Sequence, residues 1–376
     1  MKSLFKIDIN PNRVYGLDIL RALAILFVVS VHGKKMMPEP ISKLVGVFIF
    51  DGVSIFFVLS GFLIGGILIK LLEQKEINTK LILNFWIRRW FRTLPNYFLV
   101  LIVLFLLNVI FNEKFNLYDT KLYFLFSQNL FSKHPAFFPE AWSLSVEEWF
   151  YLLVPILLFI LLKIFKISIN KSILLTAFSI VIGVTIFRYI KYDTIVINDM
   201  QTWGLTIRKQ VFTRLDSLMY GVIGAYVFFY YKTFWNKYRM LFLIVGIALF
   251  IFTKRKVMGF EVFGLYHTVF SLSITSLATL LLLPYLSHLK TGKGLLFKIL
   301  TYVSLVSYSM YLINLTVVQQ WIMGNIDWTI IQNFDGSVFL LVRYLLYWFL
   351  TIAISILIYK YFEIPMMNLR DKIKIK

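Results

Sequence analysis

The chain has 376 residues, of which 59% are apolar and only 15% are charged, and its mean hydropathy is +0.78. A soluble domain carries about 25% charged residues, so a lipid bilayer is expected to cover much of this apolar surface. The 39 Lys and Arg against 19 Asp and Glu give a net charge of +20. In a membrane protein this excess is typical of basic cytoplasmic loops rather than of nucleic-acid binding. Cysteine is absent and the four histidines are scattered, which excludes a thiolate nucleophile and argues against a metal centre.

A membrane-spanning helix requires about 20 mostly apolar residues. The runs that qualify are 16–33, 44–69, 93–112, 143–162, 172–190, 211–230, 239–253, 265–288, 299–323 and 338–362. The sequence therefore predicts an all-α, polytopic membrane helix bundle of about ten transmembrane helices. Residues 1–376 are expected to form a single integral-membrane domain without an appended soluble domain. The first run resembles a signal peptide, but Asp18 and Arg21 interrupt it, so we expect a retained helix.

Basic residues gather in alternate connections between these runs, and in both terminal segments. By the positive-inside rule those connections and both termini are cytoplasmic. Lys34, Lys35 and the basic residues at 254–256 fall on the other side and do not fit the rule. The long connections 113–141 and 191–210 are then external. Their polar and aromatic residues are compatible with sugar binding and equally with a simple wet surface.

The first predicted helix contains Arg21 and His32, which are eleven residues apart. At about 100° per residue they share one helical face and lie roughly 16 Å apart along the axis. Asp18 is one turn before Arg21 and can pair with it. A charge at this depth must face protein or water. One interpretation is purely structural, with an Asp–Arg pair and a hydrogen-bonded histidine. The position of Arg21 and His32 on one helical face instead favours a functional site.

Arg88, Arg89 and Arg92 cluster at the cytoplasmic mouth of the third predicted helix. Guanidinium groups suit phosphate recognition, although a basic membrane anchor is an equally good interpretation of this spacing. Glu363 ends the last predicted helix, where an acid opposes the helix dipole. We therefore expect a cationic partner for Glu363, and these arginines are on the same side.

Two further segments place charges at the ends of predicted helices. Glu147 and Glu148 enter a membrane helix together, either as functional carboxylates or as acids at a wet helix N-terminus. Arg214 and Asp216 are two apart and share no helical face, so each must find a partner on another element. The small residues that repeat every four positions in this helix, and in the second one, favour close helix packing: Ser217, Gly221 and Ala225, and Gly61 and Gly65.

Taken together, these segments resemble the acyltransferase-three family of bacterial integral-membrane O-acyltransferases, in order and over nearly the whole chain. The matching residues are Arg21 with His32, the segment 52–62, Arg88 with Arg89 and Arg92, Trp142, Ser143, Ser145 and Glu147 in the segment 142–147, Arg214 with Asp216, and Glu363 with Pro365. Two positions depart from the family pattern. Ser54 stands where the family usually has an acid, for which Asp51 is a candidate substitute, and Asn314 stands where the family often has a second histidine.

The resemblance implies transfer of an acyl group, usually acetyl, from acetyl-CoA or another acyl-CoA to a sugar hydroxyl, without a metal. The acceptor would be a cell-surface polysaccharide, such as a lipopolysaccharide O-antigen, or a lipid-linked or exported glycan. The protein would sit in the bacterial cytoplasmic membrane as a multi-pass protein, with lipid, acyl-CoA and glycan as its partners and no nucleic acid. The sequence is silent on the oligomeric state.

The resemblance also suggests roles for individual residues. His32 is predicted to be the general base, with Arg21 and Glu147 completing the catalytic group, because imidazole titrates near working pH. Arg88, Arg89 and Arg92 are predicted to hold the CoA phosphates. The remaining predicted residues support the site or the substrate: Asp18, Ser54, Trp142, Ser143, Ser145, Arg214, Asp216, Asn314 and Glu363.

Two alternatives stay open from the sequence. A glycan or lipid transporter or flippase would also carry buried charges, although the chain shows no internal repeat. A catalytically degenerate family member is the other alternative, because Ser54 and Asn314 replace residues of the expected pattern.

Overall fold

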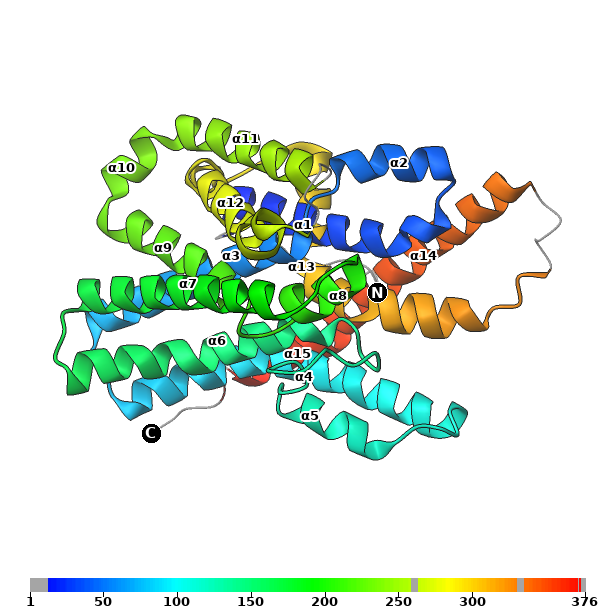
Figure 1. The fold of residues 1–376 in the computed structure, drawn as a ribbon, viewed down its shortest axis with the longest axis horizontal. Coiled ribbons are helices and arrows are strands. Elements are labelled where there is room, and N and C mark those ends of the chain that lie inside the picture. Colours follow the sequence, from blue (N-terminus) through cyan, green and yellow to red (C-terminus); the bar gives the residue numbers. More distant parts are fainter. Residues whose placement is uncertain (1–12, 258–262, 330–334, 371, 373–376) are drawn as a thin grey trace.

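The computed structural model describes residues 13–257, 263–329, 335–370 and 372, and these ranges consist of helices and connecting loops, without strands (Figure 1). The α-helices are α1 (Tyr15–Gly33), α2 (Glu39–Phe48), α3 (Gly52–Gln74), α4 (Thr79–Phe111), α5 (Lys121–Phe124), α6 (Ala141–Phe159), α7 (Ile169–Thr194), α8 (Met200–Trp203), α9 (Leu215–Tyr230), α10 (Lys232–Lys237), α11 (Arg239–Val257), α12 (Ser271–His288), α13 (Gly294–Ile313), α14 (Gly336–Ile358) and α15 (Ile364–Arg370). Short 3₁₀ segments lie at Lys34–Met36, Leu117–Thr120 and Met323–Asn325.

Eight helical stretches in the described ranges are long and apolar enough to cross a membrane, which confirms the polytopic all-α fold. The expected span 211–230 coincides with α9, which has only 16 residues, and the expected span 239–253 coincides with α11. The exact number of ten spans and the cytoplasmic position of both termini stay predictions.

Helix boundaries differ from the predicted ones where polar residues belong to a helix. The third predicted span begins at residue 93, whereas α4 begins at Thr79, because the Asn78 side chain accepts a hydrogen bond from the Leu81 amide at 2.8 Å. The arginines at 88, 89 and 92 therefore lie within α4 rather than in a connection. The second predicted span is divided, because Asp51 caps the start of α3 and separates it from α2.

Close helix packing occurs where glycine was predicted to allow it. A Cβ at Gly61 of α3 would collide with the backbone of Leu218 in α9, and a Cβ at Gly221 of α9 would collide with the backbone of Val58 in α3. The missing side chains let these two backbones come together, as small residues do in membrane bundles. The predicted packing role of these glycines is therefore confirmed.

Helix α1 lies in the middle of the bundle and packs against α3, α12 and α13, which come from distant parts of the sequence (Figure 1). Gly52 at the start of α3 allows this contact, because a Cβ there would collide with the carbonyl of Ala24 in α1. Most of α1 is consequently surrounded by protein rather than lipid. Its charged residues can face protein-lined cavities, which is the arrangement that buried charges in a membrane require.

Five short π-helical segments continue or precede the α-helices, at Ile160–Ile164, Gly204–Arg208, Tyr266–Phe270, Asn314–Ile322 and Tyr359–Glu363. Segments of this kind are rare and often occur at functional sites. Four of these segments contribute a polar residue to the cavities described below. Arg208, His267 and Glu363 line a cavity, and Asn314 contacts His32, which lines one.

Candidate active site

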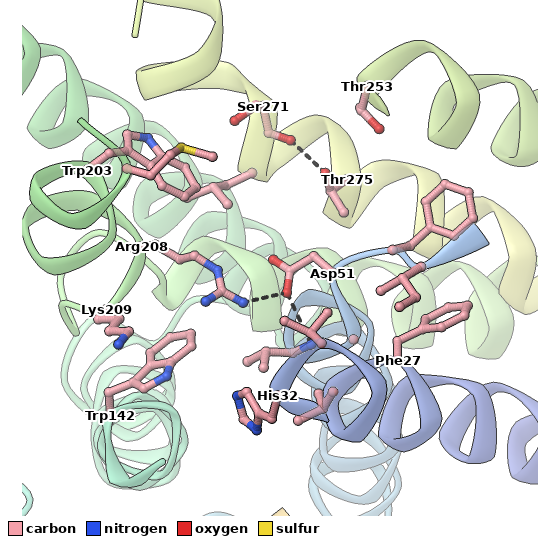
Figure 2. A pocket seen from close by; sticks show the side chains of 18 of the residues that line it. Phe27, His32, Asp51, Trp142, Trp203, Arg208, Lys209, Thr253, Ser271 and Thr275 are labelled. Carbon is pink, nitrogen blue, oxygen red and sulfur yellow. Dashed lines mark hydrogen bonds and ion pairs between the residues drawn. The ribbon is translucent and has the colours of Figure 1, made fainter. Parts of the chain in front are cut away.

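Two cavities lie along α1, one near each of its ends. The first, which we call the histidine cavity, has a volume of about 480 Å³ and is lined by His32, Asp51 and Arg208, among others (Figure 2). The second, the arginine cavity, has a volume of about 360 Å³ and is lined by Arg21 among others. Val53 and Tyr311 line both cavities and separate them. Arg21 and His32 therefore face the same side of α1, as their spacing predicts, but they lie in different cavities.

The hydrogen bonds around His32 determine which of its ring nitrogens carries the proton. The Asn314 amide nitrogen donates to the carbonyls of Met310 and Tyr311, both at 2.8 Å. Its Oδ1 atom therefore faces His32 Nδ1, at 2.6 Å, and can only accept. His32 Nδ1 must then carry the hydrogen, and Nε2 keeps a free lone pair. The same Oδ1 atom also accepts a hydrogen bond from the Tyr347 hydroxyl at 3.2 Å.

A carboxylate lies in the histidine cavity although Ser54 replaces the expected acid. Asp51 accepts a hydrogen bond from the Ser54 hydroxyl at 2.7 Å and forms an ion pair with Arg208 at 2.9 Å (Figure 2). Ser54 is completely buried and also accepts a hydrogen bond from Arg214, at 2.7 Å. Ser54 thus links Asp51 to Arg214, and Asp51 supplies the carboxylate for which the sequence analysis named it as a candidate.

The two long connections that were predicted to be external both contribute to the histidine cavity. Glu140 comes from the first, and Trp203, Arg208 and Lys209 come from the second. The Arg208 guanidinium lies 5.3 Å from the centre of the Trp142 ring, which places the predicted residue Trp142 in the wall of this cavity. Sugar binding by these connections stays a prediction, and their position beside His32 agrees with it.

Glu140 fixes the chain beside Asn314. Its carboxylate accepts hydrogen bonds from the amides of Leu315 (3.2 Å) and Thr316 (2.7 Å) and from the Thr316 hydroxyl. Burial raises the pKa of Glu140 to about 7, and the hydrogen bonds from Thr316 and Leu315 only partly offset this effect. Glu140 therefore stabilises the start of the π-helical segment that presents Asn314 to His32.

At the other end of α1, the predicted pair between Asp18 and Arg21 is present. Their charged atoms are 3.7 Å apart, and Asp18 forms a closer ion pair with Arg13. Ser304 of α13 donates a hydrogen bond to Asp18 at 2.8 Å. Asp18 is buried and shares its single negative charge between two guanidinium groups at the wall of the arginine cavity, so a net positive charge remains there.

Glu147 lies in the arginine cavity and not beside His32, where it was predicted to act. Its carboxylate accepts hydrogen bonds from Ser60 at 3.1 Å and from Tyr151 at 2.9 Å. The reason is depth: Glu147 is six residues into α6, roughly 9 Å along the helix, beyond the wall between the cavities. Its neighbour Glu148 is buried and accepts a hydrogen bond from Thr93 at 2.7 Å.

The predicted arginine cluster is held together at the end of the arginine cavity. Arg89 and Arg92 line that cavity, and both also line an adjoining cavity of about 720 Å³, where Arg88 joins them. Arg89 donates a hydrogen bond to the Tyr151 hydroxyl at 2.8 Å. Arg13, Arg21 and Arg370 also line the arginine cavity. Together with Arg89 and Arg92, five arginines therefore line it.

Glu363 lines the arginine cavity together with Arg92, but the residues that donate hydrogen bonds to it are neutral. Its carboxylate accepts hydrogen bonds from Asn96 at 2.7 Å and from Ser309 at 2.9 Å. In the described residues no ion pair within 4 Å joins it to the arginines at 88, 89 and 92, but the charge of Arg92 acts on it within the same cavity, which agrees with the expected cationic partner. Two hydrogen bonds satisfy the buried carboxylate instead.

The remaining predicted support residues are buried, but not all of them line a cavity. Ser143 lines the arginine cavity and donates a hydrogen bond to Tyr311 at 2.6 Å, whereas Ser145 accepts one from Gln128 at 2.6 Å, away from the cavities. Asp216 forms a buried ion pair with Arg188 of α7 at 2.5 Å. Arg214 and Asp216 thus find partners on other elements, as predicted, and Asp216 stabilises helix packing rather than lining either cavity.

Among the cavity-lining residues that sequence reasoning missed are Arg13, Glu140, Lys209 and Tyr311. Arg13 and Glu140 stand next to predicted residues, just before α1 and just before Trp142, which is a weak signal that was available. Tyr311 lies three residues before the predicted Asn314, which is a similar signal, whereas only the tertiary fold brings Lys209 to its cavity. Among the described residues, no group of three or more His, Asp or Glu side chains could hold a metal ion.

The fold and these cavities define a polytopic membrane protein with a histidine and a cluster of arginines on either side of a shared wall. A family model described as an acyltransferase domain matches residues 14–360, and the chain belongs to that family. The predicted family resemblance is thereby confirmed. No solved structure matches the chain significantly.

Curated relatives are named as O-acetyltransferases. The chain is 37% identical over 185 residues to the peptidoglycan O-acetyltransferase OatA of Listeria monocytogenes serovar 1/2a, which covers 45% of this chain and 27% of that protein. It is 28% identical to a putative O-acetyltransferase of Staphylococcus aureus strain COL, over 93% of this chain and 56% of that protein. It is 29% identical to the O-acetyltransferase OatA of Staphylococcus aureus strain NCTC 8325, over 81% of this chain and 50% of that protein. The chain thus spans about half or less of the length of these relatives.

Proposed function

We propose that this protein is a membrane O-acetyltransferase that moves an acetyl group from acetyl-CoA to a hydroxyl of a cell-envelope glycan. The observation that carries the proposal is the pair of cavities that meet at Val53 and Tyr311. One cavity contains a histidine with a free Nε2 lone pair, and the other contains five arginines. Family membership and the names of the relatives support the same reaction class.

The arginine cavity is suited to the donor. The phosphates of CoA need several cations, and guanidinium groups bind them in pairs of parallel hydrogen bonds. Arg88, Arg89 and Arg92 occupy the entrance, so the phosphates would bind there and the thioester arm would extend inward past Ser60 toward Tyr311. Because basic residues favour the cytoplasm, this entrance would face the cytoplasm, where CoA is present.

The histidine cavity is suited to the acceptor. His32 Nε2 takes the proton of the acceptor hydroxyl while the hydroxyl oxygen attacks the thioester carbonyl carbon. The new C–O bond forms, the C–S bond breaks, and CoA leaves as a thiolate that recovers the proton from the imidazolium. Asn314 accepts a hydrogen bond from Nδ1 throughout and keeps the ring in the productive orientation. Direct transfer of this kind needs no covalent acyl-enzyme.

The relatives from Listeria and Staphylococcus indicate which acceptor to test first. One is named a peptidoglycan O-acetyltransferase, so peptidoglycan or its exported precursors are the first candidates. Other surface polysaccharides, including O-antigens, and lipid-linked glycans are the next. With its acceptor site away from the cytoplasm, the protein would act as a multi-pass protein of the bacterial cytoplasmic membrane.

The decisive experiment measures transfer of labelled acetyl from acetyl-CoA to isolated envelope glycans by the purified protein in proteoliposomes. His32→Ala should abolish transfer and leave the thermal stabilisation by CoA unchanged, because His32 does not line the arginine cavity. His288→Ala is the matched control, since His288 is exposed at the end of α12. Substantial transfer by His32→Ala would refute the role of this base.

Replacement of Arg88 and Arg92 by glutamine should weaken CoA binding at least tenfold. The control Arg239→Gln should not, because Arg239 lines none of the cavities described here.

The rival function is a transporter or flippase. For an acyltransferase, acetyl-CoA but not acetate should raise the melting temperature of the detergent-solubilised protein. No shift at saturating CoA would favour the transporter.

A further inference from the structure

The charges that line the histidine cavity do not balance. Arg208, Lys209 and Lys254 are cationic, whereas Asp51 and Glu140 are the carboxylates. Asp51 is committed to its ion pair with Arg208. Because burial raises the pKa of Glu140 to about 7, this carboxyl group is partly protonated at neutral pH and offsets less than a full positive charge.

Two of the three cations are already held by the protein. Arg208 pairs with Asp51 and lies over the Trp142 ring. Lys254 donates hydrogen bonds to the carbonyls of Gly46 and Ile49, at 2.7 and 2.8 Å, where α2 ends. Each of these side chains therefore has a structural task.

Lys209 is different. Within the described residues its ammonium group has no hydrogen bond and no ion pair, although the side chain is half-buried. Burial and the neighbouring Arg208 lower the pKa of Lys209, and Glu140 counteracts this only in part. The protein alone thus leaves a partly desolvated cation on the cavity wall, an arrangement that an anionic ligand would stabilise.

The surroundings of Lys209 indicate which ligand fits. Figure 2 shows Lys209 and Trp142 on one side of the cavity, His32 beside them, and the apolar Phe27 on the other side. The indole of Trp142, with Arg208 over its ring, lies in the cavity wall near the ammonium group of Lys209. A ligand with a negative charge would bind the ammonium group while it presents a hydroxyl to His32, because both residues line this cavity.

We propose that the histidine cavity selects an acidic acceptor, a sugar with a carboxylate or phosphate group that binds Lys209. This inference rests on the proposed function, since it names the acceptor class for the same site. Lys209 is then a specificity-determining residue: it binds the acceptor charge and takes no part in proton transfer. The carboxylate and the phosphate share the chemistry that Lys209 recognises, and different probes can distinguish them.

The test uses three probes with one common ring: methyl glucoside, methyl glucuronide and glucose 1-phosphate. Binding is measured by the thermal shift of the full-length protein, and acetylation by transfer of labelled acetyl from acetyl-CoA. We expect at least one charged probe to bind at least tenfold more tightly than methyl glucoside, because charge-assisted hydrogen bonds are stronger than neutral ones. Lys209→Gln should remove this preference, and Lys209→Arg should keep most of it. Lys133→Gln is the matched control, since Lys133 is exposed on the same side and lines neither cavity.

The outcomes separate this inference from the proposed function. Binding that depends on both probe charge and Lys209, but without acetylation, would support the acidic ligand and contradict the transferase. Acetylation of all three probes with equal KM would support the transferase and overturn the inference. A preference for charged probes that survives Lys209→Gln would also overturn it. A preference for glucose 1-phosphate over methyl glucuronide would assign the charge to phosphate, and the reverse would assign it to a sugar carboxylate.

Discussion

Replacing Asn314 by leucine removes the group that keeps the proton on His32 Nδ1. The hydrogen bond between them is 2.6 Å long, and Asn314 is completely buried, so water cannot replace the lost acceptor. An unsatisfied buried donor costs about 1–3 kcal/mol, and hydrogen bonds to charged groups contribute about 1.5–3 kcal/mol. In the proposed mechanism the imidazolium that forms during proton transfer depends on this bond, so we expect kcat to fall roughly 10- to 100-fold.

The assay compares kcat and KM for acetyl transfer between the wild type, Asn314→Leu and Asn314→His. Histidine offers a ring nitrogen as acceptor and should restore kcat to within about tenfold of the wild type if that ring nitrogen takes over the acceptor role. KM for acetyl-CoA should not change, because Asn314 does not line the arginine cavity. Leucine also removes the hydrogen bonds to Met310 and Tyr311, so the melting temperature is measured in parallel. A wild-type kcat in Asn314→Leu would refute the assigned tautomer and the role of Asn314 as a positioning residue.

Two further predictions concern stability. Gly61→Ala should destabilise the protein by about 1–3 kcal/mol because its Cβ meets the Leu218 backbone, whereas Gly66→Ala on the same helix, with open space around it, should not; equal melting temperatures would contradict the close packing. The raised pKa of Glu140 favours its protonated form in the fold, so stability should be highest below the usual glutamate pKa and fall by about 3 kcal/mol as pH rises through about 7. Glu140→Gln should remove that part of the dependence between pH 5 and pH 8 in melting experiments, and an identical profile would show that Glu140 does not titrate in this range.

The fold was predictable to the extent that it depends on apolar runs. The runs gave the helical class and most spans, because a bilayer imposes length and composition on every crossing helix. Their ends were less predictable. Asn78 starts α4 well before its apolar part, and Asp51 divides α2 from α3. Both boundaries depend on a single capping side chain, which changes hydropathy too little for an average over a run to detect.

The candidate site was predictable within one helix and less so between helices. Helical spacing placed Arg21 and His32 on one side of α1, and Asp18 beside Arg21. It could not show that Val53 and Tyr311 from two other helices stand between them. It also placed Glu147 near His32, since residue order alone does not tell how deep a residue lies relative to another helix. Distances along a helix follow from the sequence, whereas distances between helices follow from packing.

The two departures from the family pattern become understandable together. Ser54 accepts a hydrogen bond from Arg214 and donates one to Asp51. A carboxylate therefore remains in the histidine cavity, one turn before the expected position, where it pairs with Arg208. Asn314 cannot titrate, but its side-chain amide is held by hydrogen bonds to the carbonyls of Met310 and Tyr311. Its Oδ1 atom can therefore only accept the Nδ1 hydrogen of His32. A second histidine could exchange donor and acceptor roles with the first. The asparagine removes that ambiguity, so the substitution that argued for a degenerate family member instead favours a single, well-defined base.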